Sequence, residues 1–391
     1  MKAIVIAPQP FFSPRGTPFS VYYRTLVKAE LGVKIDLLTY GEGQDVDVSG
    51  VRTIRIPRFS FLGDVKVGPS YLKLLLDAFM MVWTIGLLLH NRYDFVHAHE
   101  EAVFFCRFLK PIFRFKLVYD MHSSLPQQLI NFQFTTFKFF IRLFKKLEKT
   151  CLRKADAVIT ICPDLADYAN SILLDKSKHI LIENSIFDPI KINPNESAIE
   201  TDHEEKPLEL PEGKRFVVYA GTLEPYQGIG LLITAFKKVY EENLDAFLLI
   251  VGGTKDQAQQ YSSMAQRYNV ESHTLFTGSV TQSLAKYYCS VASVLVSPRI
   301  RGTNTPLKIY EQIASGIPLV ATRIYSHTQV LKNEMAILVD PEPDAMARGI
   351  LAALDGDGKQ AAQNARQFYD QNYSRPVYVQ KIRQLLKLLS G

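Results

Sequence analysis

The densest group of polar side chains lies within residues 297–318, where a predicted strand is followed by a polar loop and then a helix. This helix is expected to begin near Thr305, with Pro306 in its first turn. N–H groups at a helix start lack intrahelical partners, so with Lys308 and Arg299 they form an anion site suited to a diphosphate. The other candidate ligands in this segment are Thr303, Asn304, Thr305 and Leu307.

Glu311 lies almost one helical turn beyond Lys308, so both side chains are expected on nearly the same helix face. Its carboxylate could accept hydrogen bonds from ribose hydroxyls. The alternative is an ordinary capped helix with a surface Lys–Glu pair, which is worth only a few tenths of a kcal/mol.

Two further candidates follow predicted strands in the first half of the chain. Gly16 lies at a strand-to-helix turn, where a glycine lets backbone N–H groups approach a phosphate; an ordinary tight turn explains it equally well. His122 follows the predicted strand 116–119, at the sheet edge where ligands of open α/β folds bind. The alternative for His122 is a hydrogen-bonded histidine of the core.

His97 and His99 end another predicted strand and invite comparison with a metal pair. We expect their side chains to point to opposite faces of the strand, so that one metal ion would not contact both. No metal site is predicted.

Short apolar strands alternate with helices along the chain, which predicts an α/β fold of two doubly wound parallel sheets, each covered on both faces. The predicted strands are 2–7, 34–39, 95–98, 116–119, 157–161, 179–183, 216–220, 246–251, 274–277, 294–297, 318–322 and 336–339. The predicted helices are 21–29, 72–90, 137–154, 228–241, 256–268, 305–315, 343–354 and 377–389. The most apolar segment, 78–89, is too short to span a bilayer and is expected to be a buried helix.

The pattern divides the chain into a first domain (1–188), a linker or mobile acidic loop (189–214), a second domain (215–374) and a last helix (375–391) that packs back towards the first domain. Two such domains place a ligand cleft at the carboxyl ends of both sheets.

The composition, 47% hydrophobic and 21% charged, excludes a disordered chain. A net charge of +6 is too small to predict nucleic-acid binding. The four cysteines lack C-x-x-C spacing, which predicts reduced thiols in a reducing compartment.

The basic excess gathers in the predicted helix 137–154, which contains seven cations and one acid. Its apolar and basic residues fall on different sides, which is typical of an amphipathic helix in contact with an anionic membrane surface. The alternative is a core helix with a solvated basic face. The predicted membrane-contact residues are Lys138, Arg142, Lys145, Lys146 and Lys149.

Several of these segments together resemble the GT-B glycosyltransferases, specifically glycosyltransferase family 4, over nearly the whole chain. The resemblance rests on residues 95–99, 120–122, 219–232, 251–253, 276–278 and 297–318. It implies the GT-B fold, with 1–188 as the acceptor-side domain and 215–374 as the nucleotide-sugar-binding domain. It also implies retaining transfer of a hexose-type sugar from a UDP- or GDP-sugar, with no cofactor and no required metal.

The resemblance also implies residue roles: Gly16 and basic residues of the second domain hold the diphosphate, Glu311 binds the ribose, and His122 is the catalytic residue at the reacting sugar. Three positions depart from the family pattern. Thr303 stands where the family has a first glutamate, and Thr222 and Gln227 stand where it has an arginine and a lysine. By position, all three are still expected to be donor-binding residues. We therefore hypothesise that Lys308 and Arg299 replace the missing cations.

The function that follows is transfer to a glycan or lipid-linked acceptor, in cell-envelope polysaccharide or glycolipid synthesis. The protein is expected in the cytoplasm, peripheral at the inner face of the cell membrane, with no nucleic-acid partner. Two alternatives stay open. One is a non-catalytic nucleotide-sugar-binding or scaffold protein of the same fold, and the other is an enzyme of this shape that is not a transferase, such as a sugar-nucleotide epimerase.

Overall fold

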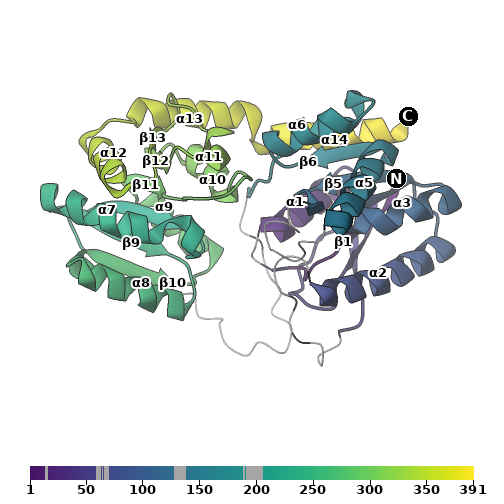
Figure 1. Ribbon diagram of the computed structural model, residues 1–391, viewed down its shortest axis with the longest axis horizontal. Helices are drawn as coiled ribbons and strands as arrows, with labels where there is room; N and C mark the ends of the chain where they lie inside the picture. The colour runs from purple at the N-terminus through teal and green to yellow at the C-terminus, as the bar shows by residue number, and fades with distance from the viewer. Residues whose placement is uncertain are drawn as a thin grey trace. The chain divides into compact units, whose positions relative to one another are not determined.

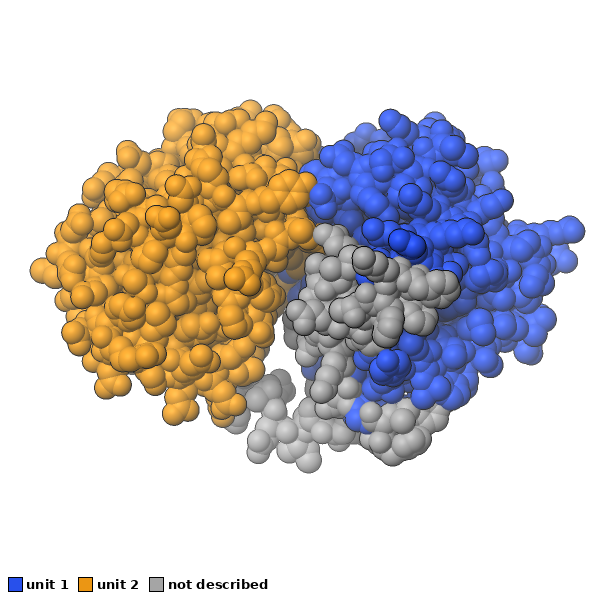
Figure 2. All heavy atoms as spheres, in the orientation of Figure 1, with its two compact units in different colours: residues 1–186, 190–199, 375–391 blue, residues 187–189, 200–374 orange. Residues whose placement is uncertain are grey.

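The computed structural model describes residues 1–13, 16–58, 63, 65, 70–126, 138–187, 190 and 206–391, except for the side chains of 138–140. They belong to two compact units, coloured separately in Figure 2. Unit 1 is formed by 1–186, 190–199 and 375–391, and unit 2 by 187–189 and 200–374. The linker expected over 189–214 falls largely outside the described residues.

Unit 1 is built on a seven-stranded sheet in the order β3-β2-β1-β4-β5-β6-β7, in which neighbouring strands pair in parallel. Strands β1, β2, β4, β5 and β6 are buried over nearly their whole length, which explains their continuous apolar sequences. The chain order reverses between β1 and β4, which is where open α/β sheets bind ligands. The strands are β1 (Lys2–Ala7), β2 (Lys34–Thr39), β3 (Val51–Arg55), β4 (Phe95–His99), β5 (Lys116–Met121), β6 (Ala157–Thr160) and β7 (His179–Leu181).

Six helices of unit 1 are described: α1 (Gly16–Glu30), α2 (Tyr71–His90), α3 (Ala102–Phe113), α5 (Lys138–Lys154), α6 (Pro163–Ile172) and α14 (Arg375–Ser390). The last of these, α14, packs against α1 and β6 (Figure 1). Arg375 of α14 donates to the carboxylate of Glu30 on α1 at 2.6 Å, and Lys381 pairs with Glu183. The end of the chain is thereby part of unit 1.

Unit 2 repeats the architecture with a six-stranded sheet in the order β10-β9-β8-β11-β12-β13, again paired in parallel. The order reverses between β8 and β11. The strands are β8 (Arg215–Ala220), β9 (Ala246–Val251), β10 (Thr274–Gly278), β11 (Val294–Ser297), β12 (Leu319–Thr322) and β13 (Ile337–Val339). The α-helices are α7 (Ile229–Glu242), α8 (Lys255–Arg267), α9 (Gln282–Ser290), α10 (Leu307–Ser315), α11 (Tyr325–Thr328), α12 (Pro343–Asp355) and α13 (Lys359–Asn372).

The structure corrects two expectations about helices. The helix expected from Thr305 begins at Leu307, because Pro306 has an extended backbone and acts as the N-cap. The segment 78–89 was expected to be buried, but α2 buries only Leu76, Met80, Thr84 and Leu88 along its length. One face of α2 packs on the core of unit 1, its flanks are partly buried, and the opposite face is exposed.

Candidate functional site

The ends of β8 and β11 lie side by side in unit 2, and the loops that follow them are packed together. Gly228, which precedes α7, has a φ of +76°. A Cβ built on it would lie 2.0 Å from the carbonyl oxygen of Pro298, so only glycine permits this approach. The amide of Ile300 also donates to the carbonyl of Tyr226 at 2.9 Å. The segment 221–228 is thereby fixed against the polar loop that precedes α10.

Lys308 lies in the first turn of α10 with its ammonium group buried. Its Nζ has no hydrogen-bond partner among the described residues. It lies 4.0 Å from the ring centroid of Tyr219, and a Cβ on Gly221 would be 3.7 Å from it. Burial, together with the nearby charge of Arg299, lowers the pKa of Lys308 from 10.5 to about 7. A buried cation without a partner is costly, which points to an anionic ligand as its missing partner.

Arg299 supplies a second positive charge and also shapes the loop before α10. Its Nε donates to the carbonyl of Arg301 at 2.6 Å, and its guanidinium carbon lies 5.2 Å from the ring centroid of Tyr226. Burial lowers its pKa. The hydroxyl of Thr305 is buried and finds no hydrogen-bond partner in the described part of the chain. Because α10 has no side-chain cap, its N–H groups add to the same anion site.

Glu311 lies one turn further along α10, as the spacing predicts. Burial raises its pKa to about 7, and the positive charge of Lys286 opposes that shift. Cys289 is near enough for the charges of Glu311 and Lys308 to act on its thiol in opposite directions. Glu311 and Lys308 therefore border one partly buried region at the start of α10. This is the arrangement expected for a ribose and a diphosphate.

The remaining predicted donor-binding residues lie in the same two loops. The Nε2 of Gln227 donates to the hydroxyl of Thr222 at 3.4 Å, so these two uncharged residues are neighbours. The backbone carbonyl of Thr303 accepts from Gln329, and the carbonyl of Asn304 lies 3.5 Å from Nη1 of Arg299. Leu307 is the first residue of α10. Unit 2 thus brings together the residues predicted from the sequence between Thr222 and Glu311.

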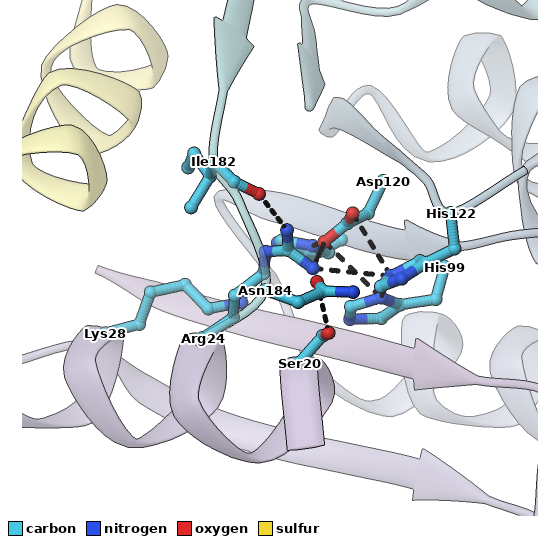
Figure 3. A network of polar contacts seen from close by, with 9 residues as sticks. Ser20, Arg24, Lys28, His99, Asp120, His122, Ile182 and Asn184 are labelled. Carbon is cyan, nitrogen blue, oxygen red and sulfur yellow. Dashed lines mark hydrogen bonds and ion pairs between the residues drawn. The ribbon is translucent and has the colours of Figure 1, made fainter. Parts of the chain in front are cut away.

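Unit 1 contains a second polar cluster, buried between α1 and the ends of β4 and β5 (Figure 3). Arg24 of α1 is fully buried; its Nη1 lies 3.2 Å from Oδ2 of Asp120, and its Nη2 donates to the carbonyl of Ile182 at 2.7 Å. The Nε2 of His122 lies 3.2 Å from Oδ1 of Asp120, 3.0 Å from Nδ1 of His99 and 3.3 Å from Nη1 of Arg24. His122 is 3% exposed and takes part in this network, and its predicted catalytic role stays a prediction.

Lys28, one turn beyond Arg24, extends the cluster to His97. Its Nζ lies 3.0 Å from Nδ1 of His97, and Nε2 of His97 lies 2.8 Å from Oδ2 of Asp120. Since an ammonium only donates, His97 accepts through Nδ1 and donates through Nε2. Burial lowers the pKa of Lys28 to about 7 and that of His97 to about 3. Burial alone would raise the pKa of Asp120, but Arg24 and the histidines outweigh it and hold it well below its usual range.

The expectation that His97 and His99 point to opposite faces is wrong. Residues two apart on a strand share a face, and these rings stack with centroids 4.6 Å apart. One ligand atom each from His97, His99 and Asp120 lie within 4.8 Å of one another. Arg24 and Lys28, however, occupy Asp120 and the Nδ1 atom of His97. Two cations face the single carboxylate of Asp120, so a divalent ion in this position would be repelled.

Sequence reasoning missed Arg24 and Lys28. Their signal is the spacing of Ser20, Arg24 and Lys28, which places three polar residues four apart on the buried face of α1. Ser20 is tied through its hydroxyl to Asn184 (Figure 3). Gly16 is the first residue of α1 and is exposed, with no atom within 4 Å of a built Cβ.

Of the predicted membrane-contact residues on α5, Arg142, Lys145, Lys146 and Lys149 are exposed. The side chain of Lys138 lies outside the described residues. Glu148, the one acid of the segment, is buried and accepts hydrogen bonds from Ser124 and Tyr168. The exposed charged residues of α5 over this stretch are therefore all basic, and Leu143 is exposed among them.

Comparison with known proteins identifies the family. A family model described as glycosyl transferase 4-like domain matches residues 22–185, and one described as glycosyl transferases group 1 matches residues 200–370. The chain belongs to the family 4 glycosyltransferases. This glycosyltransferase is 25% identical over 370 residues to phosphatidyl-myo-inositol mannosyltransferase of Mycobacterium tuberculosis, covering 91% of the chain and 88% of the relative. It is 22% identical to a subunit of the phosphatidylinositol N-acetylglucosaminyltransferase of Arabidopsis thaliana, covering 90% of the chain and 74% of that relative.

Solved structures confirm that this glycosyltransferase has the GT-B fold of two Rossmann-like domains. Sucrose-phosphate synthase from Thermosynechococcus elongatus superposes with a TM-score of 0.73 at 19% identity, covering 100% of this chain and 99% of that one. HepE from Anabaena in complex with UDP superposes with a TM-score of 0.69 at 14% identity, covering 100% of both chains. These likenesses establish the fold expected from the sequence.

Proposed function

We propose that this glycosyltransferase transfers a hexose-type sugar from a UDP- or GDP-sugar to a glycan or lipid-linked acceptor, with retention of anomeric configuration and without a required metal. The observation that carries the proposal is the buried ammonium of Lys308, which has no hydrogen-bond partner among the residues that the structure describes and lies beside Arg299 at the uncapped start of α10. A nucleoside diphosphate supplies the negative charge that this site lacks. HepE, which shares the fold, has been crystallised with UDP and with UDP-glucose.

The same groups serve the chemistry. As the bond between the sugar and the diphosphate breaks, negative charge grows on the departing phosphate oxygen. Lys308, Arg299 and the N–H groups of α10 stabilise that charge without reorganising, and removing one such donor typically costs about 3–4 kcal/mol of transition-state stabilisation. Glu311 in its ionised form accepts hydrogen bonds from the ribose. His122, in the resemblance to the family, lies at the reacting sugar, and the network of Arg24 and Asp120 fixes its ring.

The acceptor is proposed from the relatives and from α5. Two relatives bear names that specify phosphatidylinositol-type lipids. The exposed cations of α5 suit an anionic membrane surface, to which each basic residue adds roughly 1 kcal/mol. We therefore place the protein at the cytoplasmic face of the cell membrane, in cell-envelope polysaccharide or glycolipid synthesis.

The test is donor turnover followed by NMR. The purified chain is incubated in EDTA with UDP-glucose, UDP-N-acetylglucosamine and GDP-mannose, with and without vesicles that contain phosphatidylinositol. Release of UDP or GDP, with the α configuration of the donor kept in the first-formed sugar product, supports the proposal. A β product or strict dependence on added metal contradicts it.

A second candidate is a non-catalytic nucleotide-sugar-binding protein. The observation that favours it is the pair of uncharged neighbours Thr222 and Gln227, with Thr303 where the family has a glutamate. Saturable UDP or GDP binding without turnover of any donor would support this second function.

A further inference from the structure

Helix α2 exposes a continuous apolar stripe. Its six exposed large apolar residues recur at helical spacing, and three of them, Tyr71, Val82 and Leu89, are 80%, 56% and 69% exposed. The other three are Leu74, Leu75 and Met81. The charged side chains of the helix are engaged elsewhere: Asp77 accepts from the hydroxyl of Tyr40 at 2.7 Å, and Lys73 lies 4.0 Å from Glu101. The outward stripe is therefore apolar without a charge.

The opposite side of α2 is held by the core of unit 1. Leu76, Met80 and Leu88 belong to that core, and Trp83 packs against it while remaining partly exposed. A helix that faces water on one side normally has polar residues there, whereas the exposed large side chains of α2 as far as Leu89 are apolar. Among the described residues it is the one helix long and apolar enough to cross a membrane. Because its inner face is packed on the sheet, it suits the plane of a bilayer surface rather than a span.

The neighbouring helices extend the surface and add charge to it. Helix α3 packs against α2 and exposes Phe108 and Ile112, together with the cation Arg114. Helix α5 packs against α3 and carries the exposed cations of its basic side. Apolar residues flanked by cations match the two layers of a bilayer surface, acyl chains and anionic headgroups.

We propose that α2 is an interfacial helix, whose outward stripe lies among the acyl chains of an anionic bilayer while Arg114 and the exposed cations of α5 contact the headgroups. This inference rests on the membrane association in the proposed function and names α2 as the inserting element. Electrostatic attraction by α5 alone would be lost in high salt. Insertion of α2 instead makes part of the binding independent of salt.

A tryptophan on the outward stripe provides a reporter of insertion. Trp83, the one tryptophan of the chain, packs against the core, so the reporter is Val82→Trp in a Trp83→Phe background. This full-length variant is mixed with vesicles of phosphatidylcholine and phosphatidylglycerol, some brominated at shallow acyl positions. We expect the fluorescence of the new tryptophan to be quenched by the brominated lipid, and part of the binding to survive 0.5 M salt. Bound protein whose fluorescence is not quenched would overturn the proposal.

Matched variants distinguish the contribution of the apolar stripe of α2 to vesicle binding from that of the cations of α5. The double variant Leu75→Ser, Val82→Ser removes two exposed apolar residues, and its partition into vesicles is expected to fall at least tenfold. Leu244→Ser, which replaces a leucine of unit 2 that is more exposed than Leu75 or Val82, is expected to leave partition unchanged. Lys145→Gln with Lys149→Gln is expected to remove only the salt-sensitive part. Equal binding by the Leu75, Val82 variant and the unchanged protein would overturn the role of α2.

Calorimetry of UDP and GDP binding keeps the outcomes distinct. Variants that lose vesicle binding but bind nucleotide as before are folded and support the proposal. A chain that binds nucleotide but no vesicles, or one that instead forms a dimer lost in the Leu75, Val82 variant, overturns the inference and leaves the donor site intact. A chain that binds vesicles but no nucleotide contradicts the proposed function and not this inference.

Discussion

Replacing Lys308 by methionine should stabilise the free protein and abolish nucleotide binding. Burial lowers the pKa of Lys308 from 10.5 to about 7, so the unfolded chain holds its proton more tightly than the folded one. At 1.36 kcal/mol per pKa unit, the buried ammonium costs about 5 kcal/mol of stability below pH 7. This cost diminishes as pH rises from 7 to 10.5. The cation–π contact with the Tyr219 ring offsets part of this cost. We therefore expect Lys308→Met to raise the free energy of unfolding by roughly 3 kcal/mol at pH 6.5.

The same substitution should weaken nucleotide binding although it stabilises the fold. Removing one partner of a buried charge pair typically costs about 3 kcal/mol, so the affinity of Lys308→Met for UDP or GDP should fall at least 100-fold. Urea unfolding and calorimetry measure the two effects on the same preparations. Lys238→Met is the matched control, because Lys238 pairs with Asp344 at 2.6 Å on the surface. It should change either quantity by less than about 1 kcal/mol.

A gain in stability together with a loss of nucleotide affinity distinguishes a ligand-binding lysine from the alternatives. A lysine that holds the fold together would lose stability on replacement by methionine, and a lysine without a role would leave nucleotide affinity unchanged. Either result for Lys308→Met, with a normal control, would refute the assignment of Lys308 to the ligand.

Three other predictions follow from the same structure. Arg24→Met should cost about 3–5 kcal/mol in urea unfolding because it strips Asp120 of a buried partner, whereas Arg375→Met removes an exposed pair with Glu30 and should cost under about 1 kcal/mol; equal losses would contradict the buried network. The folded state keeps His97 and His99 neutral, so the urea midpoint should fall as pH drops from 6.5 towards 3; a flat profile would contradict the lowered pKa values. Gly228→Ala should cost at least about 2 kcal/mol and weaken nucleotide binding, whereas Gly213→Ala, at a similar φ but in open space, should cost about 1 kcal/mol; matching losses would show that the contact with Pro298 is not limiting.

The alternation of elements could be predicted because parallel strands buried on both faces are apolar throughout. β1 and β9 show this, and the sequence places both correctly. β3 was not predicted, because it is an edge strand with half-exposed side chains and lacks that signature. α3 was not predicted either, and Pro111 within its last turn weakens its helical pattern.

More of the polar cluster of unit 2 than of unit 1 could be predicted from the sequence. The residues of unit 2 directly follow the end of a strand, so their spacing in the sequence is enough to predict that Arg299, Lys308 and Glu311 lie close together. The cluster of unit 1 needs Arg24 and Lys28, which come from a helix and read as solvated charges until the packing of α1 is known. For an apolar helix such as α2, the sequence does not show whether the helix contacts the protein core or a bilayer, because both environments favour apolar residues.

Calorimetric titration of the purified chain with UDP and with GDP in EDTA measures whether the start of α10 binds a nucleoside diphosphate. We expect saturable binding of one nucleotide over the other, which is lost in Lys308→Met and kept in Lys238→Met. Binding of neither nucleotide by the folded protein would contradict it. The uncharged residues Thr222 and Gln227 would then be decisive, and Lys308 and Arg299 would not replace the missing cations.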